Sequence, residues 1–234
     1  MRHFTLLLGL ALPVLFALPR SIAAQEADTR PGIAVLEFSN GGSYGPKREN
    51  LDNLGVGMQK MLLTELQQNP AIRIVERSAL KQLIEEQNLA TSGRVDAGTA
   101  AQVGRLVGAR YVVLGSFADL FGNFRMDGRI VDVETGEVMY ATSVQAKFER
   151  MYPLVVELAQ KITSGVKLPP LAARVVRERS ARVMPPEASE LLSNAEAAAD
   201  MGQKELAVEL YRRMIREFPQ YTEAREALQQ LNAS

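Results

Sequence analysis

Three consecutive β-rich runs are the feature that most constrains how this chain can fold. They cover Tyr111 to Leu120, Phe124 to Val133 and Val138 to Phe148. The first two are separated by Gly122-Asn123, which suits a tight turn, and the last two by Glu134-Thr135-Gly136-Glu137, which is typical of a hairpin. Consecutive strands joined by such short turns pair antiparallel. The sequence therefore predicts an antiparallel meander.

Shorter apolar segments on either side of this meander predict further strands and helices. Apolar positions recur every three to four residues in the expected helices, whereas the expected strands are short runs of β-formers. The order predicts an α/β (α+β) fold, a mixed sheet flanked by helices, over residues 32–166. The expected elements are a strand Gly32 to Phe38, a Gly-rich loop Ser39 to Pro46, a helix Leu51 to Leu66, a strand Ile72 to Val75, a helix capped by Ser78, a helix Asp96 to Val107, and a helix Pro153 to Ile162.

The first 24 residues have the pattern of a cleavable secretion signal. Arg2 supplies the positive start, Phe4 to Leu18 an apolar stretch, and Ser21 to Ala24 small residues suited to cleavage after about Ala23 or Ala24. The apolar stretch is about 15 residues long, and a membrane-spanning helix needs roughly 20. We therefore expect a signal peptide over residues 1–24 and a periplasmic protein, with outer-membrane association as an option.

Composition narrows the chemistry of the exported chain. The sequence has no cysteine, and its only histidine, His3, lies in the expected signal. Catalytic triads, Cys-His pairs and the usual zinc sites all need these residues. We therefore expect that the chain is not an enzyme and that it binds no cofactor. We also expect no catalytic, cofactor-binding or metal-binding residues. A lipid anchor is not expected either, because a bacterial lipoprotein needs a cysteine to acylate.

Net charge argues against nucleic acid as a partner. Without Arg2 and Arg20 the chain carries 25 basic and 27 acidic side chains, a formal charge of −2. Proteins that bind nucleic acid present a strong excess of lysine and arginine. We therefore expect protein partners.

Residues 167–186 have the composition of a linker. Pro169-Pro170 and Pro185-Pro186 bracket a segment that contains four arginines. One interpretation is a short solvated helix between two helix breakers. The other is a basic element that docks on an acidic surface or on lipid headgroups, so that membrane association is peripheral at most. The four arginines are Arg174, Arg177, Arg179 and Arg182.

Residues 187–234 match the spacing of a tetratricopeptide repeat followed by a capping helix. Small residues stand where two helices would touch, a glycine stands at the turn, and a proline ends the second helix. One repeat cannot bury its own apolar faces. This helical hairpin must therefore pack on the α/β domain, on another copy or on a partner. The residues at these spacings are Leu191, Ala195, Ala198, Gly202, Ala207, Tyr211 and Pro219.

Six apolar residues are candidates for partner binding. Phe117, Phe121 and Phe124 cluster around a predicted hairpin tip, where they form a partner surface if exposed and part of the core if buried. The other three belong to the predicted helical hairpin: Leu191, Tyr211 and Tyr221.

Three segments together resemble the CsgG family, which includes the curli secretion channel and related periplasmic proteins. They are Val75 to Gln87, Ala109 to Phe117, and Arg129 to Val138 with its Thr-Gly-Glu turn. The resemblance extends over about residues 32–166 and implies a mixed sheet flanked by helices. Channel members of this family form rings in the outer membrane of Gram-negative bacteria.

The chain departs from the channel members in two respects. They are lipoproteins, whereas this chain has no cysteine. They also carry two long membrane-crossing hairpins, which would fall near Phe121-Gly122-Asn123 and between Thr142 and Pro153. A strand that crosses the membrane needs roughly 9–11 residues of alternating pattern, and neither place has room for a hairpin. We therefore expect no pore.

These observations give one leading hypothesis and two alternatives. The leading one is a non-enzymatic periplasmic CsgG-like accessory or scaffold protein, which binds other envelope proteins during assembly or export of a curli-like surface structure. The alternatives are a ring-forming outer-membrane secretion channel subunit and a periplasmic regulator of peptidoglycan synthesis. Self-association into a homo-oligomer is compatible with each.

Overall fold

The structure is a computed structural model that describes residues 28–43, 51, 53–76, 79–80, 82–83 and 95–233. The expected signal peptide over residues 1–24 lies outside the described residues. So do Ser78, the expected helix cap, and the Tyr44 to Pro46 end of the Gly-rich loop.

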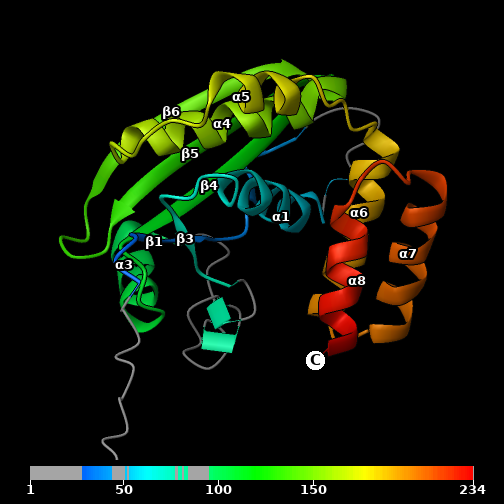
Figure 1. Cartoon of the computed structure of the whole chain (residues 1–234), viewed down its shortest axis with the longest axis horizontal. Coiled ribbons are helices and arrows are strands. Elements are labelled where there is room, and N and C mark those ends of the chain that lie inside the picture. The colour runs from blue at the N-terminus through cyan, green and yellow to red at the C-terminus, as the bar shows by residue number, and fades with distance from the viewer. Residues whose placement is uncertain are drawn as a thin grey trace, which may run out of the picture.

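A mixed sheet forms the centre of the molecule, as the sequence predicts (Figure 1). Its path runs β3-β1-β4-β5-β6, with β2 paired to β4 on the side of β1. The first strands pair parallel, whereas β4, β5 and β6 form the predicted antiparallel meander. The strands are β1 (Gly32–Val35), β2 (Ser39–Asn40), β3 (Arg73–Ile74), β4 (Tyr111–Leu120), β5 (Asn123–Asp132) and β6 (Val138–Lys147).

The expectation of a loop at Ser39 was wrong for its first two residues. Ser39 and Asn40 lie parallel to Ser116 and Phe117 of β4 and form β2. The Gly41 amide donates to the Phe117 carbonyl at 2.7 Å and continues this pairing. Two residues are too short for an alternating pattern to be recognised, so tertiary pairing decided their conformation.

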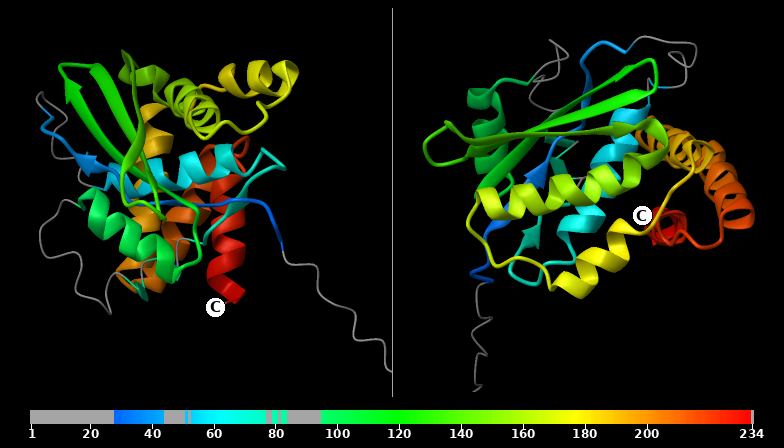
Figure 2. Two further views of the ribbon diagram at one scale, coloured as in Figure 1. Left: turned by 90° about the vertical axis from the view of Figure 1, so that its left-hand side faces the viewer. Right: turned by 90° about the horizontal axis from the view of Figure 1, so that it is seen from above.

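Helices cover both faces of the sheet (Figures 1 and 2). Helices α1 and α4 share a core with one face, and α3 packs on the other. The Asp96 side chain caps α3 by accepting from the Thr99 amide at 2.8 Å. No helix in the described part of the chain is long and apolar enough to cross a membrane. The helices are α1 (Leu54–Leu66), α3 (Ala97–Leu106), the 3-10 helix η2 (Phe148–Arg150), α4 (Met151–Gly165), α5 (Ala173–Ser180), α6 (Pro186–Asp200), α7 (Lys204–Glu217) and α8 (Glu223–Ala233).

Alternation along β5 separates the core from solvent. Phe124, Met126 and Ile130 are fully buried beneath α1 and α4, while Arg125 and Arg129 face solvent. A period of two is what an antiparallel sheet with one covered face requires. The outer half of the opposite face is therefore open and polar.

The C-terminal helices pack on the α/β domain through α1 and α6. A Cβ added at Gly57 would lie 1.9 Å from the Ser193 Oγ, so this crossing requires glycine. Beside it, the Asn53 Nδ2 donates to the Asn194 Oδ1 at 2.9 Å. One apolar core runs from the sheet through α1 into α6, α7 and α8. Of the three supports expected for the helical hairpin, the structure shows the α/β domain.

Candidate functional site

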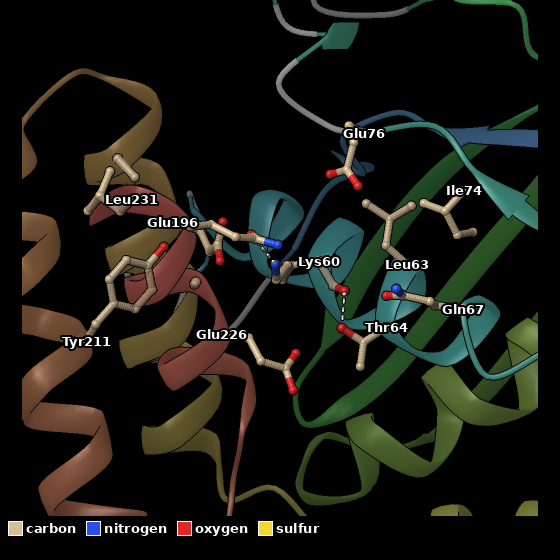
Figure 3. A pocket seen from close by; sticks show the side chains of 13 residues that line it. Lys60, Leu63, Thr64, Gln67, Ile74, Glu76, Glu196, Tyr211, Glu226 and Leu231 are labelled. Carbon is tan, nitrogen blue, oxygen red and sulfur yellow. Dashed lines mark hydrogen bonds between the residues drawn. The ribbon is translucent and has the colours of Figure 1, made fainter. Parts of the chain in front are cut away.

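A groove runs between α1 and the C-terminal helices that pack on it (Figure 3). Its volume is about 460 Å³, within the range of about 300–1,000 Å³ common for ligand sites. One wall comes from α1 and the segment around β3, and the other from α6, α7 and α8. The lining residues are Lys60, Leu63, Thr64, Gln67, Ile74, Glu76, Glu196, Ala199, Tyr211, Glu226, Ala227, Gln230 and Leu231.

The depth of the groove is apolar. Leu63 on α1 is 8% exposed, and Ala227 on α8 lies opposite it with 5% exposed. Tyr211 closes the helical side and is 2% exposed. Ile74 and Leu231 are half-buried and extend the apolar surface toward the rim. The interior therefore suits aliphatic or aromatic side chains.

Carboxylates dominate the charge of the groove. Glu76 and Glu226 are exposed at the rim, and Glu196 is buried on α6. Lys60 is the one basic side chain among the described lining residues, and its Nζ donates to the Gln230 Oε1 at 3.4 Å. Figure 3 shows Lys60 and Glu226 on facing sides of the opening. Three glutamates against one lysine favour a cationic ligand.

A buried ion pair fixes α5 to the α/β domain. The Arg179 guanidinium donates to Glu65 on α1 twice, with Nε to Oε2 at 2.9 Å and Nη2 to Oε1 at 2.5 Å. The Tyr152 hydroxyl on α4 donates to the same Oε1 at 2.5 Å. Glu65 is only 2% exposed. Two-point contact between guanidinium and carboxylate fixes orientation as well as distance.

A second ion pair fixes α8. The Arg182 Nη2 lies 3.2 and 3.3 Å from the two oxygens of Glu223, which is fully buried. The same guanidinium stacks over the Tyr152 ring at 4.9 Å and over the Tyr221 ring at 5.6 Å. Burial, followed by the neighbouring Glu65 carboxylate, raises the pKa of Tyr152 well above its usual range. Tyr152 thus stays protonated between the two carboxylates.

These contacts refine the two interpretations of the basic linker. Helix α5 has no buried residue, and Arg174 and Arg177 face solvent, in agreement with a short solvated helix. Arg179 and Arg182 instead point inward to Glu65 and Glu223. They are therefore occupied within the chain and do not present charge to an external acidic surface.

The three phenylalanines near the hairpin tip divide between core and surface. Phe117 and Phe124 are 1% and 0% exposed, with ring centroids 5.8 Å apart, so packing accounts for both. Phe121 is 77% exposed and has φ of +55°, a conformation that favours glycine or asparagine. Only Phe121 of the three is available to a partner.

The helical candidates are mostly structural. Leu191 is buried in the core between α6 and its neighbours. Tyr221 is buried, and its hydroxyl donates to the Val183 carbonyl. Tyr211 is the one of these three that lines the groove. Sequence reasoning missed Lys60, Glu196 and Glu226, because the residues that form the groove lie far apart in the chain and have no common local pattern.

No group of three or more histidine, cysteine, aspartate or glutamate side chains is arranged to hold a metal ion within the described residues.

Comparison with known families and proteins relates the first half of the chain to one family. The sequence profile of the family "Curli production assembly/transport component CsgG" matches residues 17–128. A curated protein of Rhizobium meliloti (strain 1021), described as an adenylate cyclase 3, is 24% identical over 183 residues, or 77% of this chain. The chain spans only 29% of that protein's length.

Solved structures with partial similarity come from several bacteria. The LpoB C-terminal domain from Salmonella enterica is 18% identical, with a TM-score of 0.36 over 50% of this chain and 83% of that one. TolB from Acinetobacter baumannii is 17% identical, with a TM-score of 0.42 over 60% of this chain and 29% of that one. The PelC dodecamer from Paraburkholderia phytofirmans is 15% identical, with a TM-score of 0.34 over 60% of this chain and 89% of that one.

Proposed function

We propose that this chain is a non-catalytic accessory protein of the bacterial envelope that acts in the periplasm by binding other proteins. Its process is the assembly or export of a surface structure of the curli kind. The match of residues 17–128 to the CsgG profile supports the process, and the predicted signal over residues 1–24 supports the compartment.

The groove between α1 and α8 carries the binding part of this proposal. Its apolar depth at Leu63 and Tyr211 suits apolar side chains of a partner, and its rim at Glu76 and Glu226 suits lysine or arginine. A partner segment with basic residues beside apolar ones would satisfy both parts of the groove. The tetratricopeptide interpretation of residues 187–234 supports the same role, because such repeats present grooves to partner proteins.

Ion pairs made by α1 and α8, two of the helices that form the groove, make it suitable for a scaffold. Glu65 with Arg179 and Glu223 with Arg182 fix α5 and α8 against α1 and α4. A groove whose walls are already held in place loses less conformational entropy when a partner binds. The partner then binds without remodelling the helical hairpin.

Site-specific crosslinking from the groove tests this function. A photoreactive residue at Gln230, which lines the groove, is compared with one at Gln229, its exposed neighbour outside the lining. We expect Gln230 to capture a component of a surface-structure export system in intact cells, and Glu226→Lys to reduce that capture at least tenfold. Glu209→Lys, an exposed charge reversal on α7, is the matched control.

The identity of the captured protein separates the alternatives. A peptidoglycan synthase crosslinked to Gln230 would favour the regulator of cell-wall synthesis. Large rings of this chain in detergent would favour the channel subunit. Equal capture from both positions, or capture unaffected by Glu226→Lys, would overturn the groove as the binding site.

A further inference from the structure

The outer strand β6 presents a long backbone edge that no other strand of the described chain pairs with. In the order β3-β1-β4-β5-β6 it stands at the end of the sheet and is ten residues long. Natural proteins protect such edges with short strands, prolines, charges or bulges, because an open edge is a template for another strand. A long edge strand that lacks these features is therefore open to pairing with another strand.

Protection of β6 is slight over most of its length: the ladder with β5 has one register irregularity, near the start of β6, where Met139 has no partner between Tyr140 and Val138. Its sequence, VMYATSVQAK, contains neither proline nor glycine, and its single charge is Lys147 at the last position. Among the described residues, the side-chain hydrogen bond that covers this edge comes from the Lys161 Nζ, which donates to the Ser143 carbonyl at 3.0 Å. Lys161 is 38% exposed and also pairs with Glu157 at 3.1 Å, so it can release the carbonyl at little cost.

Two hydrogen bonds define which backbone groups of β6 face outward. The Phe148 amide donates to the Gly122 carbonyl in the β4–β5 turn, so even-numbered residues face β5. The contact from Lys161 shows that the Ser143 carbonyl faces away from β5. Because antiparallel strands alternate, Ala141 and Gln145 also face outward. Their side chains are exposed on the face of the sheet opposite α4.

We propose that β6 pairs antiparallel with β6 of a second copy of this chain, about a two-fold axis at Ser143. This register places Ser143 opposite Ser143, Ala141 opposite Gln145, and Met139 opposite Lys147. It joins Ala141, Ser143 and Gln145, which all face outward in the regular part of the ladder, whereas an axis at Thr142 would join only Ala141 and Ser143 of these three. The two sheets then form one continuous sheet.

Charge and size agree with self-pairing. Like charges directly opposite each other destabilise a strand pair, and Lys147 meets Met139 in this register. Ala141 and Ser143 are small, so at the axis their side chains do not crowd those of the second copy on the same face of the sheet.

The opposite edge of the sheet excludes a head-to-tail ring made by sheet extension. That edge is β3, which spans only Arg73–Ile74. Two residues cannot pair with a ten-residue strand over its length. A two-fold pair is closed, because each copy uses the same edge.

Sedimentation of the purified chain tests this pairing independently of the groove. We expect a concentration-dependent dimer, and we expect Ser143→Lys to raise its dissociation constant at least tenfold by placing two lysines opposite each other. Ser143→Glu should weaken it likewise. An equimolar mixture of the two variants should recover a heterodimer, because the opposite residues then attract. Gln229→Lys on α8 serves as the control and should leave the dimer unchanged.

A backbone variant separates pairing from folding. Gln145→Pro removes an outward amide that the ladder with β5 does not use, so the circular dichroism spectrum should be retained while the dimer is lost. A wild-type monomer at every concentration would overturn the proposal. So would a dimer that persists in Ser143→Lys and Gln145→Pro, or a mixture of the Ser143 variants that stays monomeric.

Discussion

The Glu65 carboxylate on α1 and the Arg179 guanidinium on α5 form a two-point buried ion pair, although 114 positions separate them. Glu65 is 2% exposed, and the Arg179 side chain is 19% exposed. Hydrogen bonding to Glu65 raises the pKa of Arg179 above its usual range. The pair joins the linker to the α/β domain.

Removing the arginine of this pair should destabilise the protein strongly. Arg179→Met leaves the buried Glu65 without its cationic partner, and we expect the free energy of unfolding to fall by about 3 kcal/mol. Urea unfolding followed by circular dichroism measures this. Arg174→Met is the matched control, because its pair with Glu178 at 3.6 Å is exposed, and it should change stability by less than about 0.5 kcal/mol. Equal losses of stability in the two variants would contradict the conclusion that the buried pair of Glu65 and Arg179 stabilises the fold more than an exposed pair does.

Stability should fall at high pH because of Tyr152. Its pKa is raised in the folded protein, so its contribution is complete below the unfolded value of about 10 and is lost as pH rises above that value. While Tyr152 stays protonated in the folded state, each further pH unit should remove about 1.4 kcal/mol. Urea unfolding at several pH values measures how steeply the free energy of unfolding falls with pH. In Tyr152→Phe this fall should be smaller by about 1.4 kcal/mol per pH unit, the value for one proton. An identical slope in both proteins would exclude this origin.

Gly57 should not tolerate a side chain. Glycine inside a helix normally costs about 1 kcal/mol relative to alanine, yet we expect Gly57→Ala to lower stability by about 1–3 kcal/mol, because its Cβ would lie 1.9 Å from the Ser193 Oγ. Ser193→Gly should recover part of this loss in the double variant. Gly98→Ala on α3 is the control: its Cβ meets only the Asp96 Oδ1 at 3.4 Å, and stability should rise slightly. Thermal unfolding of the four proteins tests the sign of each change.

Phe121 should be dispensable for stability. Asn-Gly is the preferred pair for a two-residue hairpin turn with positive φ, so Phe121→Asn should raise the free energy of unfolding by about 0.5–1 kcal/mol. Phe117→Ala, in the core of the same hairpin, should instead cost about 3–5 kcal/mol. A loss of stability in Phe121→Asn would mean that the exposed ring has a structural role.

The sequence predicted those features that depend on neighbours in the chain. A period of two in β5 and the turns on either side of it were sufficient for the meander, and the spacing from Leu51 to Leu66 was sufficient for α1. The alternation also explains why Phe124 is buried, whereas Phe121 occupies the turn itself. Features that depend on distant partners were not predictable. Nothing near Arg179 indicates that it would face Glu65.

The residues of the groove were not predictable for the same reason. Lys60 and Gln230 are 170 positions apart, and each looks like an ordinary surface residue in its own helix. Only the docking of α6 on α1 brings them together. Residues 187–234 pack on another surface of the chain, as predicted. The sequence does not specify which face of α1 they pack on.

The crossing of α1 and α6 also has a consequence for synthesis. Asn53 and Asn194 meet there, although 141 residues separate them. At about 5–20 residues per second, α1 leaves the ribosome on the order of ten seconds before the helix that covers it. During that interval the nascent chain displays an apolar surface that the finished protein hides. Ribosomes that stall before α6 should therefore release products that chaperones and proteases recognise.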